Sequence, residues 1–99
     1  MSLSKIQAED RRLIILRALE DGGFTAGEAV LKQVVEQLGH RPSREQIRAD
    51  LSFLAEHNLV RLEKLPALCG ELWVAHLLPD GQDVARGRVY PGVARREPS

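Results

Sequence analysis

One helix, with its start, its buried face and its exit, is contained in the stretch Ser43-Arg44-Glu45-Gln46-Ile47-Arg48-Ala49-Asp50-Leu51-Ser52-Phe53-Leu54-Ala55-Glu56-His57-Asn58-Leu59-Val60. Ser43 followed three residues later by Gln46 is a capping-box pattern, in which each side chain bonds a free backbone N–H of the first turn. Asn58 tolerates the left-handed conformation that ends helices. The stretch therefore predicts a helix over 44–57 and an extended segment after it.

The spacing of apolar residues divides this helix into two faces. Ile47, Leu51 and Leu54 fall at i, i+4 and i+7, so we expect them to form a buried stripe. The outward side then carries Glu45, Arg48, Ala49, Ser52 and Glu56.

The same helix-start signal occurs twice earlier in the chain, as Ser4 with Gln7 and as Thr25 with Glu28. These two pairs predict helices over 5–21 and 26–38. Gly22-Gly23 and Gly39 follow them, at positions where glycine commonly ends a helix.

Downstream of the quoted stretch, residues 59–65 and 72–77 have strand character and are separated by a five-residue connection, which predicts a β-hairpin. Residues 79–87 indicate a short helix or turn closed by Gly87. The rest, 88–99, is a basic tail containing Pro and Gly, which we expect to be extended or mobile unless a partner orders it.

Three helices followed by a hairpin predict a mainly α, α+β fold, a winged helix-turn-helix with a two-stranded wing and a short C-terminal helix or tail. We divide the chain into a winged helix domain, 1–87, and the tail, 88–99. The apolar run from Leu13 to Leu16 exceeds one amphipathic stripe, which suggests burial on both sides and a homodimer. Phe53 and Trp73 are further candidates for the dimer surface, although filling a small core is the simpler role for Trp73.

Residues 43–60 resemble the recognition helix and exit of ArsR-like, MarR-like and PadR-like regulators, which end this helix in Leu-x-x-Leu-x-x-x-Gly-Leu-Val; here Asn58 replaces the glycine. Residues 77–85 similarly resemble the segment that follows the wing in many of these regulators. Over nearly the whole chain, Gln7-Ala8-Glu9-Asp10-Arg11-Arg12, the stretch 39–51, and the closing Ala-Arg-Gly-Arg and Pro-Gly-Val resemble the small winged helix proteins of Mu-like transposable phages and prophages.

Composition excludes several classes of protein. Fourteen Lys and Arg balance fourteen Asp and Glu, so any contact with nucleic acid must be local. No apolar run approaches the roughly 20 residues of a membrane span and no leader opens the chain, so we expect a cytoplasmic protein that contacts no membrane. One cysteine, Cys69, allows no internal disulfide. His40, His57 and His76 lack neighbours at ligand spacing, so we expect no metal and no cofactor.

The function expected from this pattern is a non-enzymatic DNA-binding transcriptional regulator whose partner is double-stranded DNA. Arginine suits guanine or phosphate, glutamine suits adenine, and alanine leaves room for a thymine methyl group. The predicted contacts are Arg41, Ser43, Arg44, Gln46, Arg48, Ala49, Ser52, Arg61 and Lys64. Tail contacts to phosphate are expected from Arg86, Arg88, Arg95 and Arg96.

Other interpretations remain open for several of these residues. Arg44 and Arg48 could instead form surface ion pairs, and Gln46 could be committed to the cap of Ser43. Arg61 and Lys64 could be solvated strand charges. The connection 66–70 has no positive charge, which favours a second function: a winged helix module that binds a phage or host protein.

Overall fold

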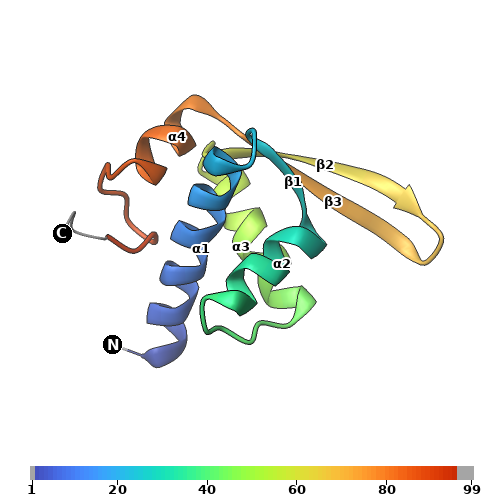
Figure 1. Cartoon of the computed structure of the whole chain (residues 1–99), viewed down its shortest axis with the longest axis horizontal. Coiled ribbons are helices and arrows are strands. Elements are labelled where there is room, and N and C mark those ends of the chain that lie inside the picture. The colour runs from blue at the N-terminus through green and yellow to red at the C-terminus, as the bar shows by residue number, and fades with distance from the viewer. Residues whose placement is uncertain (1, 96–99) are drawn as a thin grey trace.

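The computed structural model describes residues 2–95 and shows an α+β protein with four helices and a three-stranded antiparallel sheet (Figure 1). The elements follow the order α1 (Leu3–Asp21), β1 (Thr25–Gly27), α2 (Glu28–Gln37), α3 (Arg44–Glu56), β2 (Val60–Ala67), β3 (Gly70–Leu77) and α4 (Pro79–Ala85). The helices form one body, and the long hairpin β2–β3 projects from it (Figure 1). No helix within 2–95 is both long and apolar enough to span a bilayer.

Helix α1 runs through the centre of the helical body and contacts α2, α3, α4 and β3. The residues from Leu13 to Leu16 are all buried, with exposed fractions of 3% or less. Contacts within a single chain therefore bury the apolar run, which removes the reason for invoking a partner to cover this helix.

The three predicted helix starts have different outcomes. The third is confirmed, because Ser43 and Gln46 form a complete capping box at the start of α3. The first is wrong, since Ser2 and not Ser4 caps α1, its hydroxyl accepting the N–H of Lys5 at 3.2 Å.

The second predicted start, Thr25 with Glu28, is also wrong. Thr25 lies in β1, Gly27 occupies the N-cap of α2 without a side-chain bond, and Glu28 is the first helical residue. A three-residue strand is too short to show an alternating pattern. The sequence therefore predicts a helix from residue 26, whereas residues 25–27 form a short strand of the sheet and the helix begins after it.

The hairpin is longer than predicted. β2 and β3 pair antiparallel from Val60 opposite Leu77 to Ala67 opposite Gly70. Most of the predicted connection, 66–70, therefore belongs to the two strands, and only residues 68 and 69 lie between them. Asn58 has a φ of 59°, which confirms the left-handed exit from α3. At the hairpin tip the side chain of Leu68 is fully exposed.

The segment 88–95 does not extend away from the body. Val93 is buried, the N–H of Ala94 donates to the carbonyl of Glu9 at 3.0 Å, and Arg12 donates to the carbonyl of Gly92 at 2.9 Å. Two hydrogen bonds to α1 and the burial of Val93 therefore hold the described part of the predicted tail against the body.

A buried carboxylate joins α1 to α3. Asp50 is 1% exposed and accepts hydrogen bonds from Arg11 at 2.6 Å and Arg12 at 3.2 Å. Burial raises the pKa of Asp50, an effect that the two arginines oppose but do not cancel. The Arg12 guanidinium also lies over the ring of Phe53 at 4.0 Å, so the outer part of this α3 residue is covered by α1.

Candidate functional site

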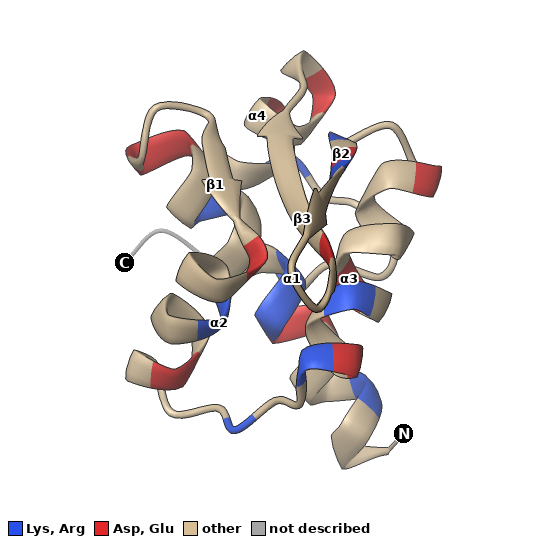
Figure 2. Ribbon diagram, turned by 90° about the vertical axis from the view of Figure 1, so that its right-hand side faces the viewer, with Lys and Arg blue, Asp and Glu red and all other residues tan. Residues whose placement is uncertain are grey.

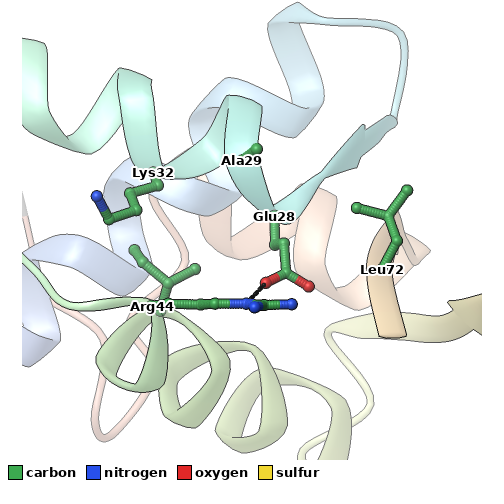
Figure 3. A pocket seen from close by; sticks show the side chains of 6 residues that line it. Glu28, Ala29, Lys32, Arg44 and Leu72 are labelled. Atoms are coloured by element: carbon green, nitrogen blue, oxygen red, sulfur yellow. Dashed lines mark hydrogen bonds and ion pairs between the residues drawn. The ribbon is translucent and has the colours of Figure 1, made fainter. Parts of the chain in front are cut away.

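The candidate site is centred on Glu28, the first residue of α2, whose exposed fraction is 5%. Its carboxylate accepts the Nε–H of Arg44 at 2.9 Å, and it accepts both Nε–H and Nη2–H of Arg48 at 3.0 Å. It also accepts the backbone N–H of Trp73 at 2.7 Å. One buried carboxylate thus joins α2, α3 and β3; Figure 3 shows Glu28 reaching down to Arg44.

The same arrangement extends the sheet after β1 has ended. The β1–β3 register pairs Gly27 with Val74, so Glu28 is the next position, opposite Trp73. Its side-chain carboxylate accepts the backbone N–H of Trp73, which the carbonyl of a further strand residue would otherwise accept. Nη2 groups of Arg44 and Arg48 donate to the carbonyl of Glu71 at 2.9 and 2.7 Å. Side chains of α2 and α3 therefore satisfy the edge of β3 in place of a strand.

Two cations lie over the indole ring of Trp73. The guanidinium carbon of Arg48 is 4.7 Å from the ring centroid, and the Lys64 ammonium is 4.3 Å from it. Cations in this position are attracted to the ring face. Within the described residues, the buried Nε1 of Trp73 has no hydrogen-bond partner. The ring therefore contacts a cation of α3 and a cation of β2.

The charges in this cluster stabilise one another. Burial alone would raise the pKa of Glu28, but hydrogen bonds from Arg48, Arg44 and the N–H of Trp73 together hold it below its ordinary value. The hydrogen bonds to Glu28 raise the pKa of Arg48. Glu28 is consequently ionised at neutral pH, and the cluster of one carboxylate and two guanidinium groups keeps a net positive charge.

A pocket of about 320 Å³ lies beside this cluster, between α2, α3 and the hairpin (Figure 3). Its lining consists of Glu28, Ala29, Lys32, Arg44, Ile47 and Leu72. The walls are largely apolar, and the side chains of Lys32 and Arg44 provide positive charge at the rim.

The structure brings the predicted DNA contacts of α3 close to the hairpin but commits several of them to other bonds. Arg44 and Arg48 form ion pairs, as the alternative interpretation holds, although their partner is the buried Glu28 and not a surface acid. The side chain of Arg44 is still 52% exposed, and that of Arg48 is 23% exposed. Ser43 and Gln46 bond each other in the capping box.

The other predicted residues of this region remain accessible to different degrees. Ala49 is exposed on α3, and Ser52, one turn further along, is half-buried. Arg61 and Lys64 are exposed on β2, and Arg41 is exposed in the connection between α2 and α3. In the ribbon of Figure 2, Lys and Arg positions are interspersed with Asp and Glu positions.

Two of the predicted tail contacts lie at the end of α4, since Arg86 is its C-cap and Arg88 follows two residues later. Arg86 pairs with Glu20 at 2.6 Å, and Arg88 lies 3.6 Å from Asp80. Arg95 is exposed, and Arg96 falls outside the described residues. Because α4 and the hairpin lie on opposite sides of the body in Figure 1, the structure does not join Arg86 and Arg88 to the Glu28 cluster.

Sequence reasoning missed a second polar cluster on the outer face of the sheet. The hydroxyl of Thr25 is 3.0 Å from Nδ1 of His76, whose Nε2 is 3.0 Å from Oε1 of Glu63. The three residues come from β1, β3 and β2 and tie these strands together. The cluster forms because β1 pairs with β3 and adds Thr25 to the sheet. Its three residues lie far apart in the chain, so no local sequence pattern predicts it. Across 2–95 no three His, Cys, Asp or Glu side chains gather as a metal site would require.

These features define a small α+β protein in which a buried carboxylate fixes a projecting hairpin to two helices. The chain belongs to the family of gp26 of Escherichia phage Mu, an uncharacterized protein to which it is 40% identical over 97 residues, 97% of each chain. An uncharacterized Haemophilus influenzae protein is 35% identical over 65 residues, 66% of this chain and 64% of that protein. No protein-family model and no solved structure matches the chain. The relationship to phage Mu expected from the sequence is thus confirmed.

Proposed function

We propose that the chain is a winged helix protein that binds double-stranded DNA as a transcriptional regulator, with α3 entering the major groove. The element order supports the proposal: α1, the short strand β1, α2, α3 and then a hairpin. In a winged helix domain, α2 and α3 would be the helix-turn-helix and the hairpin would be the wing. The second helix of a helix-turn-helix is the one that reads base edges.

The observation that carries the proposal is the attachment of the hairpin to α3 through Arg44, Arg48 and the carbonyl of Glu71. These bonds fix the angle between the reading helix and the wing before any ligand is bound, and such preorganisation lowers the entropy cost of binding. The outward surface of α3 would meet the groove at Ala49 and Ser52. The exposed guanidinium of Arg44 would lie beside them, with Arg61 and Lys64 reaching phosphate from the wing.

The experiment must spare Arg44 and Arg48, because removing them would leave Glu28 buried without its partners. Ala49→Glu instead adds a negative charge at an exposed position of α3 and keeps a good helix former. The matched control is Gln7→Glu, which adds the same charge at an exposed position of α1. Binding is measured by fluorescence anisotropy with random and phage-derived duplexes at two salt concentrations.

If the proposal holds, the wild type binds with an affinity that falls steeply with salt, because phosphate contacts release counterions. Ala49→Glu should weaken binding by about tenfold, since like charges brought together at an interface cost binding energy. Gln7→Glu should bind as the wild type does. No binding by the wild type at low salt, or equal affinity of the two variants, would contradict the proposal.

A second function is favoured by the hairpin tip, where Leu68 is fully exposed and Leu65 and Leu72 are each about 40% exposed. Large exposed apolar side chains beside one another are typical of protein-binding surfaces. In this alternative the tip binds a phage or host protein. A partner bound at high salt, lost with Leu68→Asp and kept with the matched variant Leu3→Asp, would replace DNA binding as the function.

A further inference from the structure

The pocket beside the Glu28 cluster has the size and position of a small-molecule site. It has a volume of about 320 Å³ and lies between α2, α3 and β3. Ligand pockets in proteins range from about 300 to 1,000 Å³, so this one suits a ligand of one or two rings. In Figure 3, Leu72 lies on one side of the Glu28 carboxylate and Lys32 on the other.

Most of the lining is apolar. Ile47 is 1% exposed, so it belongs to the buried side of the pocket. Leu72 is 40% exposed and Ala29 is also exposed, so these two residues belong to the side that solvent reaches. Covering this apolar surface with an apolar ligand removes it from water, which favours binding.

The charged groups of the lining favour an anion. Arg44 and Lys32 contribute two positive charges, whereas the negative charge of Glu28 is already compensated by Arg44 and Arg48. The carboxylate is also the less accessible group, since the side chain of Glu28 is 6% exposed and that of Arg44 is 52% exposed. A ligand that enters from solvent therefore meets positive charge before it meets the carboxylate.

Arg44 keeps donor capacity for a ligand. Its Nε–H donates to Glu28 and its Nη2 donates to the carbonyl of Glu71, while Nη1 has no partner within residues 2–95. The ammonium of Lys32 pairs with Glu36, one turn further along α2, at 3.1 Å. Both side chains of this pair are partly exposed, and such surface pairs hold their groups weakly. The ammonium can therefore also attract a ligand at the rim.

We propose that this pocket binds a small organic anion, whose apolar body lies against Ile47 and Leu72 and whose anionic group accepts Nη1–H of Arg44. Hydrogen bonds between charged groups are shorter and stronger than neutral ones. The ammonium of Lys32 adds attraction from the same rim. The site does not depend on the DNA-binding proposal, and its test contains no DNA.

The probe is 8-anilinonaphthalene-1-sulfonate, and its matched control is N-phenyl-1-naphthylamine, which has the same rings but no sulfonate. Fluorescence titration measures both affinities, and isothermal titration calorimetry should show one sulfonate probe bound per chain. The neutral analogue should bind about tenfold more weakly, because it cannot form the charged hydrogen bond. Equal affinities for the two probes would overturn the proposal.

Two variants locate the probe. Leu72→Ala should weaken binding by about tenfold, because it removes part of the apolar wall. Leu65→Ala is the matched control, since Leu65 lies opposite Leu72 and is similarly exposed, at 38%, but is not part of the lining. Lys32→Glu should weaken binding by about fivefold, because it replaces attraction with repulsion at the rim. Lys5→Glu, at an exposed position of α1, should leave binding unchanged.

Circular dichroism checks that every variant is folded. Equal weakening by Leu65→Ala and Leu72→Ala would overturn the proposal, because the probe would then lie on the exposed leucines of the hairpin. Equal affinities of Lys32→Glu and Lys5→Glu would also overturn it, as would a wild type that binds no probe at millimolar concentration.

Discussion

The carboxylate of Glu28 lies opposite Trp73 and accepts its backbone N–H at 2.7 Å, at the position where the next residue of β1 would have offered a carbonyl. The chain enters α2 at this point, so the side chain of Glu28 accepts the hydrogen bond that a backbone carbonyl of β1 would have accepted. Because the same carboxylate holds Arg44 and Arg48, the hairpin and α3 are positioned by one residue of α2. The ion-pair cluster therefore links the hairpin to both α2 and α3.

Glu28→Gln should destabilise the protein. The amide oxygen can still accept the N–H of Trp73, but the two arginines lose the negative charge that compensates them. Removing one partner of a buried ion pair typically costs about 3–5 kcal/mol, and the exposure of Arg44 lowers the expected loss to about 2–3 kcal/mol. Chemical denaturation measures the free energy of unfolding. Glu56→Gln, a change at an exposed acid of α3, should have no comparable effect.

The loss caused by Glu28→Gln should depend on pH. The pKa of Glu28 is lower in the folded than in the unfolded protein, so its ionisation stabilises the fold above its ordinary value of 4.5, and this contribution is lost as pH falls through the folded value. The pKa of Asp50 is shifted upward and acts in the opposite sense. The wild type and variant must therefore be compared at each pH. Their difference should be constant near neutrality and shrink in acid; a difference independent of pH would contradict the role of the charge.

Gly81→Ala should be strongly destabilising. A Cβ at this position of α4 would clash with the carbonyl oxygen of Leu59 and lie 2.8 Å from the side chain of Leu77. Overpacking costs typically about 1–3 kcal/mol, and a clash with backbone that cannot rotate away falls at the upper end. Thermal unfolding gives the comparison with Asp80→Ala, an exposed neighbour on the same helix. Equal midpoints for the two variants would show that α4 does not pack closely on the start of the hairpin.

The parts of the fold that the sequence predicted are those with a local signal. The capping box of Ser43 and the left-handed exit at Asn58 depend on residues a few positions apart, and both are confirmed. β1 was missed because three residues form no period, and Glu28 was assigned to a cap that does not form. The ion pairs of Arg44 and Arg48 depend on a partner 16 and 20 positions away in the chain. Only the packing of α2 against α3 brings these groups together.

Gly92→Ala should release the C-terminal segment from the body. Gly92 has a φ of +88°, and a Cβ there would clash with the ring of Phe53. Trypsin cleavage after Arg95 or Arg88 should become faster as the segment detaches. Gly87→Ala is a close control, since its φ is +124° but no atom lies within 4 Å of the added carbon. Equal acceleration by both variants would assign the effect to backbone strain and not to the contact with Phe53.

Arg48→Lys should be more destabilising than Arg44→Lys, although both keep the positive charge. Arg48 donates two hydrogen bonds to Glu28 and one to the carbonyl of Glu71, and its guanidinium lies over Trp73. A lysine ammonium cannot reproduce this planar, two-pronged geometry. Arg44 donates one bond to each partner from a side chain that is half exposed. We expect Arg48→Lys to lower the free energy of unfolding more than Arg44→Lys does, because it removes more charged hydrogen bonds.

The fluorescence of Trp73, the one tryptophan of the chain, gives a second readout of the same substitution. Arg48→Lys should change its emission in the folded protein, because a cation next to the ring moves, while Arg41→Lys should leave it unaltered. If Arg44→Lys and Arg48→Lys cost equal stability and neither changes the emission, the hairpin is held by its own strand pairing and the cluster around Glu28 does not set its position.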